Sequence, residues 1–143
     1  MSADLGGLLI DGLIDGIAVV APHSPQQVAD TALMLLQATR ARFSRTEFIS
    51  CPGCGRTLYD IQSTVALIKS QFGHLKGLKI GIMGCIVNGI GEMADADYGY
   101  VGAGRGKISL YRGKELVRRS LDQEEALAAL KQLITDDGKW IEP

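Results

Sequence analysis

A chain of 143 residues with 46% apolar residues and a formal net charge of −1 has the composition of an ordinary globular domain. The balanced charge provides no basic stripe for a phosphate backbone, and no apolar run reaches the ~18 residues that a membrane span needs, so we expect neither nucleic acid nor a membrane as a partner. The N-terminus has no signal-peptide pattern, which predicts a cytoplasmic protein.

The first 22 residues are rich in glycine and apolar side chains, and the run over residues 17–20 predicts a short buried strand. The first clear helix begins at Ser24. There the order Ser, Pro, Gln, Gln places a hydroxyl at the N-cap, proline at the first helical position and glutamine at the third. Apolar residues at helical spacing extend this helix to about Arg42.

Two strands are predicted to end just before cysteines. Residues 46–50 favour a strand that leads to Cys51, and residues 78–83 favour one that leads to Cys85. Between them, the apolar spacing predicts a helix over residues 61–72 that a glycine terminates.

The rest of the chain completes a mixed fold. The glycine-rich segment 84–106 favours turns, with backbone close to a ligand, over regular structure. Residues 107–111 and 115–118 predict a hairpin, and Ser120 with Gln123 predicts the capping box of a last helix. The sequence therefore predicts an α+β or α/β domain, in which about three helices pack on a mixed β-sheet.

The three cysteines are the main candidates for chemistry, since an odd number without a secretory signal favours metal or redox chemistry over disulfides. The sequence Cys51-Pro52-Gly53-Cys54 bends the chain so that two thiolates point at one centre. Zinc ribbons, dithiol redox centres and iron–sulfur proteins all use such a pair. Cys85, also in a glycine-flanked turn, adds a third soft ligand.

Three kinds of site remain open at this point. A closed zinc site needs four cysteine or histidine ligands, and His23 and His74 lie outside these segments, which disfavours a zinc-binding structural module without excluding it. The Cys-x-x-Cys pair alone fits a thiol–disulfide protein. An iron–sulfur cluster tolerates a different fourth ligand, and Glu92, seven residues after Cys85, fits that role and a helix-start carboxylate equally well.

Two arginines lie near these segments. The glycines around Arg105 are not followed by a predicted helix, so they favour a turn over a dinucleotide site, although Arg105 could still contact an anion. Arg56, two residues after Cys54, fits either a hydrogen-bond donor to the cysteine sulfurs or a surface cation. The sequence does not separate these readings.

Three segments together resemble the C-terminal cluster domain of the 4-hydroxy-3-methylbut-2-enyl diphosphate synthase family. They are Glu47-Phe48-Ile49-Ser50-Cys51-Pro52-x-Cys54-Gly55-Arg56, Met83-Gly84-Cys85-Ile86-Val87-Asn88-Gly89-x-Gly91-Glu92 and Ala94-Asp95-Ala96-Asp97-Tyr98-Gly99-Tyr100-Val101. The resemblance covers nearly the whole chain. It implies a sheet like that of the cluster domain of sulfite and nitrite reductases.

The resemblance also implies the site. It assigns a [4Fe–4S] cluster to Cys51, Cys54, Cys85 and Glu92, and it places Asn88 against the substrate, so that Asn88 and Glu92 are the catalytic candidates. Under this reading Glu92 is a ligand and not a helix cap. Protein prepared in air is expected to lose such a cluster.

The activity implied is that of an oxidoreductase of isoprenoid biosynthesis, in the methylerythritol phosphate pathway. The family opens 2-C-methyl-D-erythritol 2,4-cyclodiphosphate by two-electron reduction with loss of water, using reduced ferredoxin or flavodoxin. Its other half is a TIM-like barrel that binds the diphosphate, and the full-length enzymes are homodimers. Residues 1–22 then correspond to the last barrel strand and its loop, and residues 23–143 to the cluster domain. We expect the chain to bind a cluster but not to turn over substrate without the barrel.

Two positions depart from the family pattern. Ile90 stands where the family has proline, which frees a backbone angle in the loop of Asn88 and Glu92 and is expected to weaken cluster retention. Ile14 stands where the family has glycine, and isoleucine adopts a positive φ only with strain, so we expect a different turn there.

Overall fold

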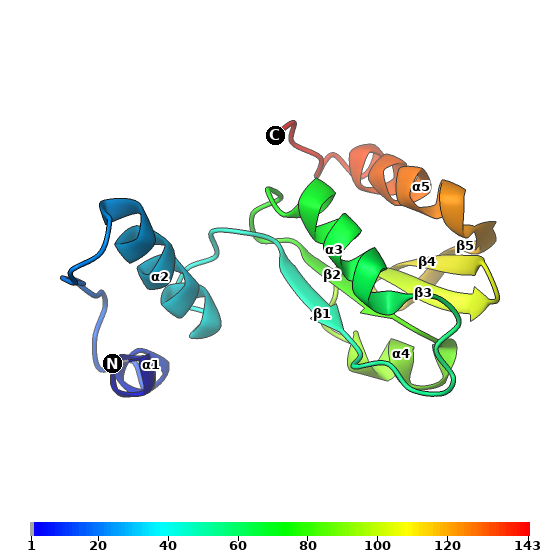
Figure 1. The fold of residues 1–143 in the computed structure, drawn as a ribbon. Helices are drawn as coiled ribbons and strands as arrows, with labels where there is room; N and C mark the ends of the chain where they lie inside the picture. The colour runs from blue at the N-terminus through cyan, green and yellow to red at the C-terminus, as the bar shows by residue number, and fades with distance from the viewer. Residues whose placement is uncertain (1) are drawn as a thin grey trace. The chain divides into compact units, whose positions relative to one another are not determined.

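The structure, a computed structural model, describes residues 2–143 except for the side chains of Ser2 and Asn88. It divides into two compact units, residues 2–44 and 45–143, which are treated separately. In chain order the elements are α1 (Ser2–Ile10), α2 (Pro25–Ala38), β1 (Glu47–Ser50), α3 (Ile61–Phe72), β2 (Lys79–Met83), α4 (Ile86–Glu92), β3 (Tyr98–Gly104), β4 (Lys107–Arg112), β5 (Glu115–Asp122) and α5 (Gln123–Asp136) (Figure 1). None of the helices in the described part of the chain is long and apolar enough to cross a bilayer.

The N-terminal unit consists of α1 and α2. The helices contact each other where Gly6 lies against Leu35 of α2 and Thr39, the C-cap residue of α2. The predicted capping box at Ser24 is confirmed, because its side chain accepts a hydrogen bond from the Gln27 backbone while Gln27 accepts one from the Ser24 backbone.

The sequence predictions for the first 22 residues were wrong in secondary structure. Residues 17–20 are irregular, and Val20 is 99% exposed. The glycine-rich apolar stretch forms α1 and not a strand. The reason is that a strand needs a partner for its backbone groups, and the described part of this unit contains no sheet to provide one. That residues 1–22 belong with a preceding barrel stays a prediction.

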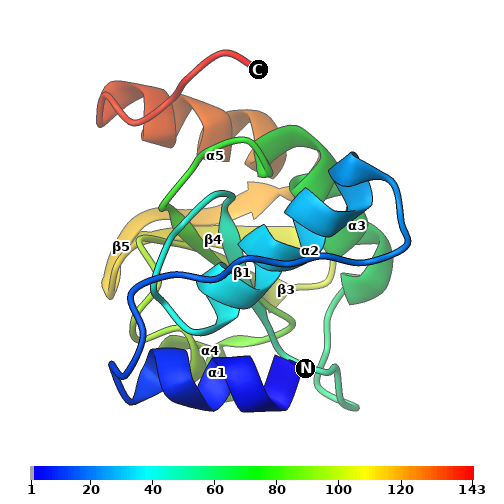
Figure 2. The same ribbon diagram turned by 90° about the vertical axis from the view of Figure 1, so that its left-hand side faces the viewer.

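The C-terminal unit is built on one five-stranded sheet with the order β1-β2-β3-β4-β5. The pairs β1–β2 and β2–β3 are parallel, and the pairs β3–β4 and β4–β5 are antiparallel. Helices α3 and α5 cover one face of the sheet, and α4 lies on the other (Figures 1 and 2). The predicted α+β fold with a mixed sheet is confirmed.

Alternating strand residues give each face of the sheet its own core. On β2, Ile80 and Ile82 pack into the larger core under α3 and α5, while Met83 packs into the smaller core on the α4 side. The smaller core contains Met83, Met93, Ala96, Val101 and Tyr111. It positions α4, and with it the chain that follows β2.

The segment 84–106 is regular, which the sequence did not predict. It forms α4 and β3, because its glycines allow close packing and not only tight turns. A Cβ on Gly81 would lie 2.6 Å from the Cβ of Met93, and one on Gly99 would lie 2.5 Å from its sulfur. Met93 therefore lies directly against the backbone of β2 and β3.

The predicted capping box at Ser120 was wrong. Ser120 lies within β5 with a φ of +53°, its N–H donates to Ser109 Oγ, and the N-cap of α5 is Asp122. The reason is that β5 continues pairing with β4 as far as Asp122, so the helix can begin only after it.

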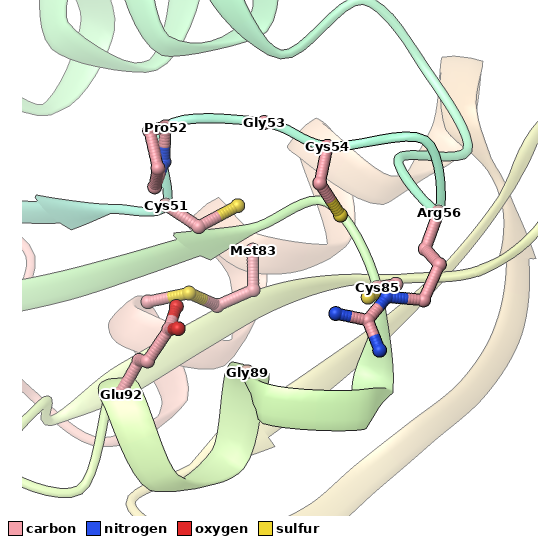
Figure 3. A pocket seen from close by; sticks show the side chains of 9 residues that line it. All are labelled: Cys51, Pro52, Gly53, Cys54, Arg56, Met83, Cys85, Gly89 and Glu92. Atoms are coloured by element: carbon pink, nitrogen blue, oxygen red, sulfur yellow. The ribbon is translucent and has the colours of Figure 1, made fainter.

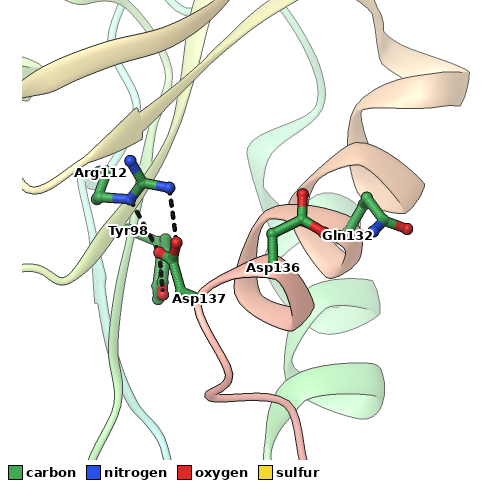
Figure 4. A network of polar contacts seen from close by, with 5 residues as sticks. All are labelled: Tyr98, Arg112, Gln132, Asp136 and Asp137. Carbon is green, nitrogen blue, oxygen red and sulfur yellow. Dashed lines mark hydrogen bonds and ion pairs between the residues drawn. The ribbon is translucent and has the colours of Figure 1, made fainter.

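The C-terminal end of α5 is held to the sheet by a polar network (Figure 4). Arg112 of β4 donates two hydrogen bonds to the Asp137 carboxylate, at 2.6 and 2.9 Å, and the Tyr98 hydroxyl donates a third at 2.8 Å. Bonding to Arg112, and then to Tyr98, lowers the pKa of Asp137 below its usual range.

The lowered pKa predicts how Asp137 contributes to stability with pH. Because the folded-state pKa lies below the unfolded value, the contribution is complete above an unfolded pKa of about 3.9 and is lost as the pH falls through the folded value. Asp137→Asn should lower the urea midpoint at pH 7, and its difference from the unsubstituted chain should shrink toward pH 2. Circular dichroism of urea titrations at several pH values measures this.

Asp136→Asn is the matched control, because the Asp136 carboxylate accepts a hydrogen bond from Gln132 of its own helix at 2.6 Å and lies apart from the Asp137 network in Figure 4. Equal midpoints for the two variants at pH 7 would show that the network does not hold α5 to the sheet.

Candidate metal centre

The parallel pairing of β1 and β2 brings two of the three cysteines together. Cys51 follows β1 directly, and Cys85 follows β2 after one residue. The ladder continues past the strands, since the Cys51 N–H donates to the Ile82 carbonyl at 3.3 Å. The Gly84 N–H then donates to the Cys51 sulfur at 3.2 Å, which fixes the direction of that thiol.

The loop after β1 returns Cys54 to the same place. Gly53 provides the turn with a φ of +83°, which other residues adopt only with strain. Cys54 and Thr57 then bond each other twice: the Cys54 N–H donates to the Thr57 hydroxyl, and the Thr57 N–H donates to the Cys54 carbonyl, both at 2.9 Å. The Leu58 N–H donates to the Gly84 carbonyl at 3.1 Å, so this loop is tied to the chain that leads to Cys85.

A cavity of about 170 Å³ lies between these segments and α4 (Figure 3). Three thiols and one carboxylate line it. The lining residues are Cys51, Pro52, Gly53, Cys54, Arg56, Met83, Cys85, Gly89 and Glu92. The structure thus brings together the four residues that the sequence proposed as ligands.

Glu92 reaches the cavity from the last residue of α4. The reading of Glu92 as a helix-start carboxylate is therefore wrong. A negative charge at the C-terminal end of a helix gains nothing from the helix dipole, so capping does not explain this position. Ligation by Glu92 stays a prediction that its place in the cavity favours.

The other sequence candidates have different outcomes. The backbone of Asn88 belongs to α4, but its side chain lies outside the described part of the structure, so its role stays a prediction. Ile90 packs against the smaller core on the α4 side. Ile14 is not among the residues with positive φ. His74 and Arg105 do not line the cavity, and the His74 ring instead lies 2.7 Å from the Ile141 carbonyl oxygen.

Arg56 is exposed, and its guanidinium group is turned toward the thiols, which favours the reading of Arg56 as a hydrogen-bond donor to the cysteine sulfurs. Figure 3 shows its guanidinium group turned toward Cys85 and below Cys54. Hydrogen bonding to Arg56, through its backbone and then its side chain, lowers the pKa of the Cys54 thiol. Hydrogen bonding to Cys54, and then the negative charges of Cys54, Cys85 and Glu92, in turn raise the pKa of Arg56.

Three thiols and one carboxylate are a donor set that an iron–sulfur cluster can use. Within the described residues, no three His, Cys, Asp or Glu side chains converge closely enough to hold one metal ion. A tetrahedral zinc site with Zn–S bonds of 2.3 Å needs its sulfurs about 3.8 Å apart. A [4Fe–4S] cluster binds each ligand at a different iron, and the three thiols and the carboxylate that line this cavity would be its four ligands.

The sheet and the thiol-lined cavity at the ends of its parallel strands together define an α+β domain with a candidate site for a soft metal centre. The family model described as the GcpE protein C-terminal domain matches residues 47–136, and the chain belongs to this family. That match contains all four candidate ligands.

Relatives in three organisms carry the name 4-hydroxy-3-methylbut-2-en-1-yl diphosphate synthase (flavodoxin). The Parabacteroides distasonis protein is 60% identical over 141 residues, which are 98% of this chain and 23% of that protein. The Bacteroides thetaiotaomicron protein is 60% identical over 143 residues, or 99% of this chain and 23% of the relative. The Chlorobaculum tepidum protein is 55% identical over 138 residues, or 96% and 18%. The chain thus spans less than a quarter of the length of these relatives.

One part of the site was missed by the sequence reading. A Cβ on Gly102 would lie 2.3 Å from the Gly84 carbonyl oxygen, so β3 touches the backbone just before Cys85. The glycine-rich pattern signalled close backbone approach, but it did not show which two segments meet.

Gly102→Ala should therefore displace the segment that carries Cys85. We expect a loss of about 1–3 kcal/mol of unfolding free energy from overpacking, because the contact is with backbone that cannot rotate away. Urea unfolding measures the loss. Gly104→Ala in the same strand is the control, since its Cβ would meet nothing closer than 3.6 Å. Equal unfolding free energies for the two variants would rule out this contact as a constraint.

The Cys54 thiol should react as a thiolate at lower pH than an ordinary cysteine. In a chain with Cys51→Ser and Cys85→Ser, the rate of iodoacetamide alkylation should rise with a midpoint below that of an ordinary exposed cysteine measured in the same way. Adding Arg56→Gln should move the midpoint upward, because the guanidinium that favours the thiolate is gone. An unchanged midpoint would contradict the Arg56 contact.

Proposed function

We propose that this chain is the iron–sulfur domain of a 4-hydroxy-3-methylbut-2-en-1-yl diphosphate synthase. The observation that carries the proposal is the single cavity lined by Cys51, Cys54, Cys85 and Glu92. These residues lie within the part of the chain that matches the family, and relatives over nearly its whole length carry this enzyme name.

In this proposal the three thiolates and the Glu92 carboxylate hold a [4Fe–4S] cluster. The cluster, when bound, supplies the electrons for the reductive opening of the cyclic diphosphate. The protein orients the ligands: the Gly84 N–H fixes the Cys51 sulfur, and the Cys54–Thr57 hydrogen bonds fix the loop that presents Cys54. Glu92 is the ligand suited to exchange, because a carboxylate is a harder donor than thiolate and binds iron less persistently.

The reaction also requires a substrate, an electron donor and a substrate-binding domain. We propose 2-C-methyl-D-erythritol 2,4-cyclodiphosphate as substrate and Asn88 as the residue of this chain that approaches it. Flavodoxin is the proposed electron donor, since the names of the relatives specify it, and ferredoxin is the alternative. The TIM-like barrel and the homodimer belong to the same proposal, and the much greater length of the relatives leaves room for such a barrel.

Anaerobic reconstitution with iron and sulfide tests the proposal. The 143-residue chain should take up about four iron and four acid-labile sulfide per molecule, as a [4Fe–4S] cluster requires. Cys85→Ser should lose most of this cluster, because one iron then lacks its thiolate. Glu92→Ala should change the absorption and EPR spectra, or reduce the iron content, because its iron becomes open.

Asp95→Ala is the matched control, since Asp95 is an exposed carboxylate just after α4 that does not line the cavity. A full cluster in Cys85→Ser would show that the ligand assignment is wrong, and a spectrum of Glu92→Ala identical to that of Asp95→Ala would remove Glu92 from the ligands. One zinc per chain without acid-labile sulfide would favour a zinc module instead.

A further inference from the structure

Arg56 differs from the other residues of the cavity in its charge. It is the one cation among the described residues that line it, and its side chain faces the thiols of Cys54 and Cys85. Glu92 also lies on this cavity. When the three thiols and the carboxylate are ionised, four negative charges line the cavity. The Arg56 guanidinium group is the positive charge that lines it with them.

Hydrogen bonds on either side hold the backbone at Arg56 in place. Arg56 lies between Cys54 and Thr57, which are joined by two hydrogen bonds. Leu58, the residue after Thr57, donates its N–H to the Gly84 carbonyl. The start of the Arg56 side chain is thus fixed within the turn that presents Cys54. The planar guanidinium carries five N–H donors in a rigid fork, so it can serve two sulfurs at once, whereas lysine would act as a single point charge.

A cation at this position affects the reduction potential of a bound cluster. Adding an electron to a cluster adds negative charge to a site that is already anionic, and hydrogen bonds to sulfur and nearby positive charge favour the reduced state. We propose that Arg56 is a positioning residue that raises the reduction potential of the cluster, by donating hydrogen bonds at the Cys54 and Cys85 corners of the cavity. This inference rests on the proposed function, since it requires the cluster.

Anaerobic redox titration of the reconstituted chain, followed by EPR, tests the inference independently of turnover. In Arg56→Gln the ratio of reduced to oxidised cluster at a fixed potential should fall about tenfold, which for a one-electron couple is a midpoint about 59 mV more negative. Arg56→Lys should shift in the same direction by less, because it keeps the charge but loses the fork. Arg105→Gln is the matched control, since Arg105 is an exposed cation outside the cavity.

The outcomes separate the inference from the function on which it rests. If the unsubstituted chain takes up no iron and sulfide, the proposed function fails, and the inference fails with it. If Arg56→Gln carries a full cluster at the midpoint of Arg105→Gln, the proposed function stands and the inference is overturned. Should Arg56→Gln not load, Arg56→Lys decides: a midpoint below that of the unsubstituted chain supports the inference, and an equal midpoint overturns it.

Discussion

The parallel pairing of β1 and β2 is the constraint on which the site depends. It places the carboxyl ends of two strands side by side, so that Cys51 and Cys85 meet although 33 residues separate them. The ladder does not stop at the strands: the Cys51 N–H reaches the Ile82 carbonyl, and the Gly84 N–H reaches the Cys51 sulfur. The same backbone interactions that build the sheet therefore also orient a thiol.

Close backbone contacts then set the positions of the surrounding segments. β3 lies against the chain before Cys85 because Gly102 has no side chain, and α4 lies on the sheet because Gly89 leaves room for Met83. Such contacts allow little adjustment, since protein interiors are densely packed and backbone cannot rotate out of the way. This packing also sets the position of Glu92, because Glu92 is the last residue of α4.

Features that depend on a short stretch of sequence, or that belong to the family motifs, were predictable from the sequence. The Ser24 cap, the two strands before the cysteines and the helix Ile61–Phe72 follow from short-range patterns, while the family resemblance placed Glu92 near the cysteines, where it lines the same cavity. The helix and strand in the glycine-rich segment 84–106 were not predictable. They depend on the packing of Met93 against β2 and β3, and the spacing of residues in the sequence does not show these contacts. The direction of Arg56 likewise depends on a turn whose hydrogen bonds only the folded chain shows.

The irregular backbone of β5 affects how readily a strand of another molecule can pair with it. This strand forms one edge of the sheet, and an unpaired edge is a template on which further strands can add. The left-handed backbone of Ser120 and the register shifts opposite Leu110 interrupt a regular edge, and Arg118 and Arg119 place adjacent positive charges along it. A second molecule approaching this edge in the same way would meet both distortion and like charge, which disfavours strand addition at β5.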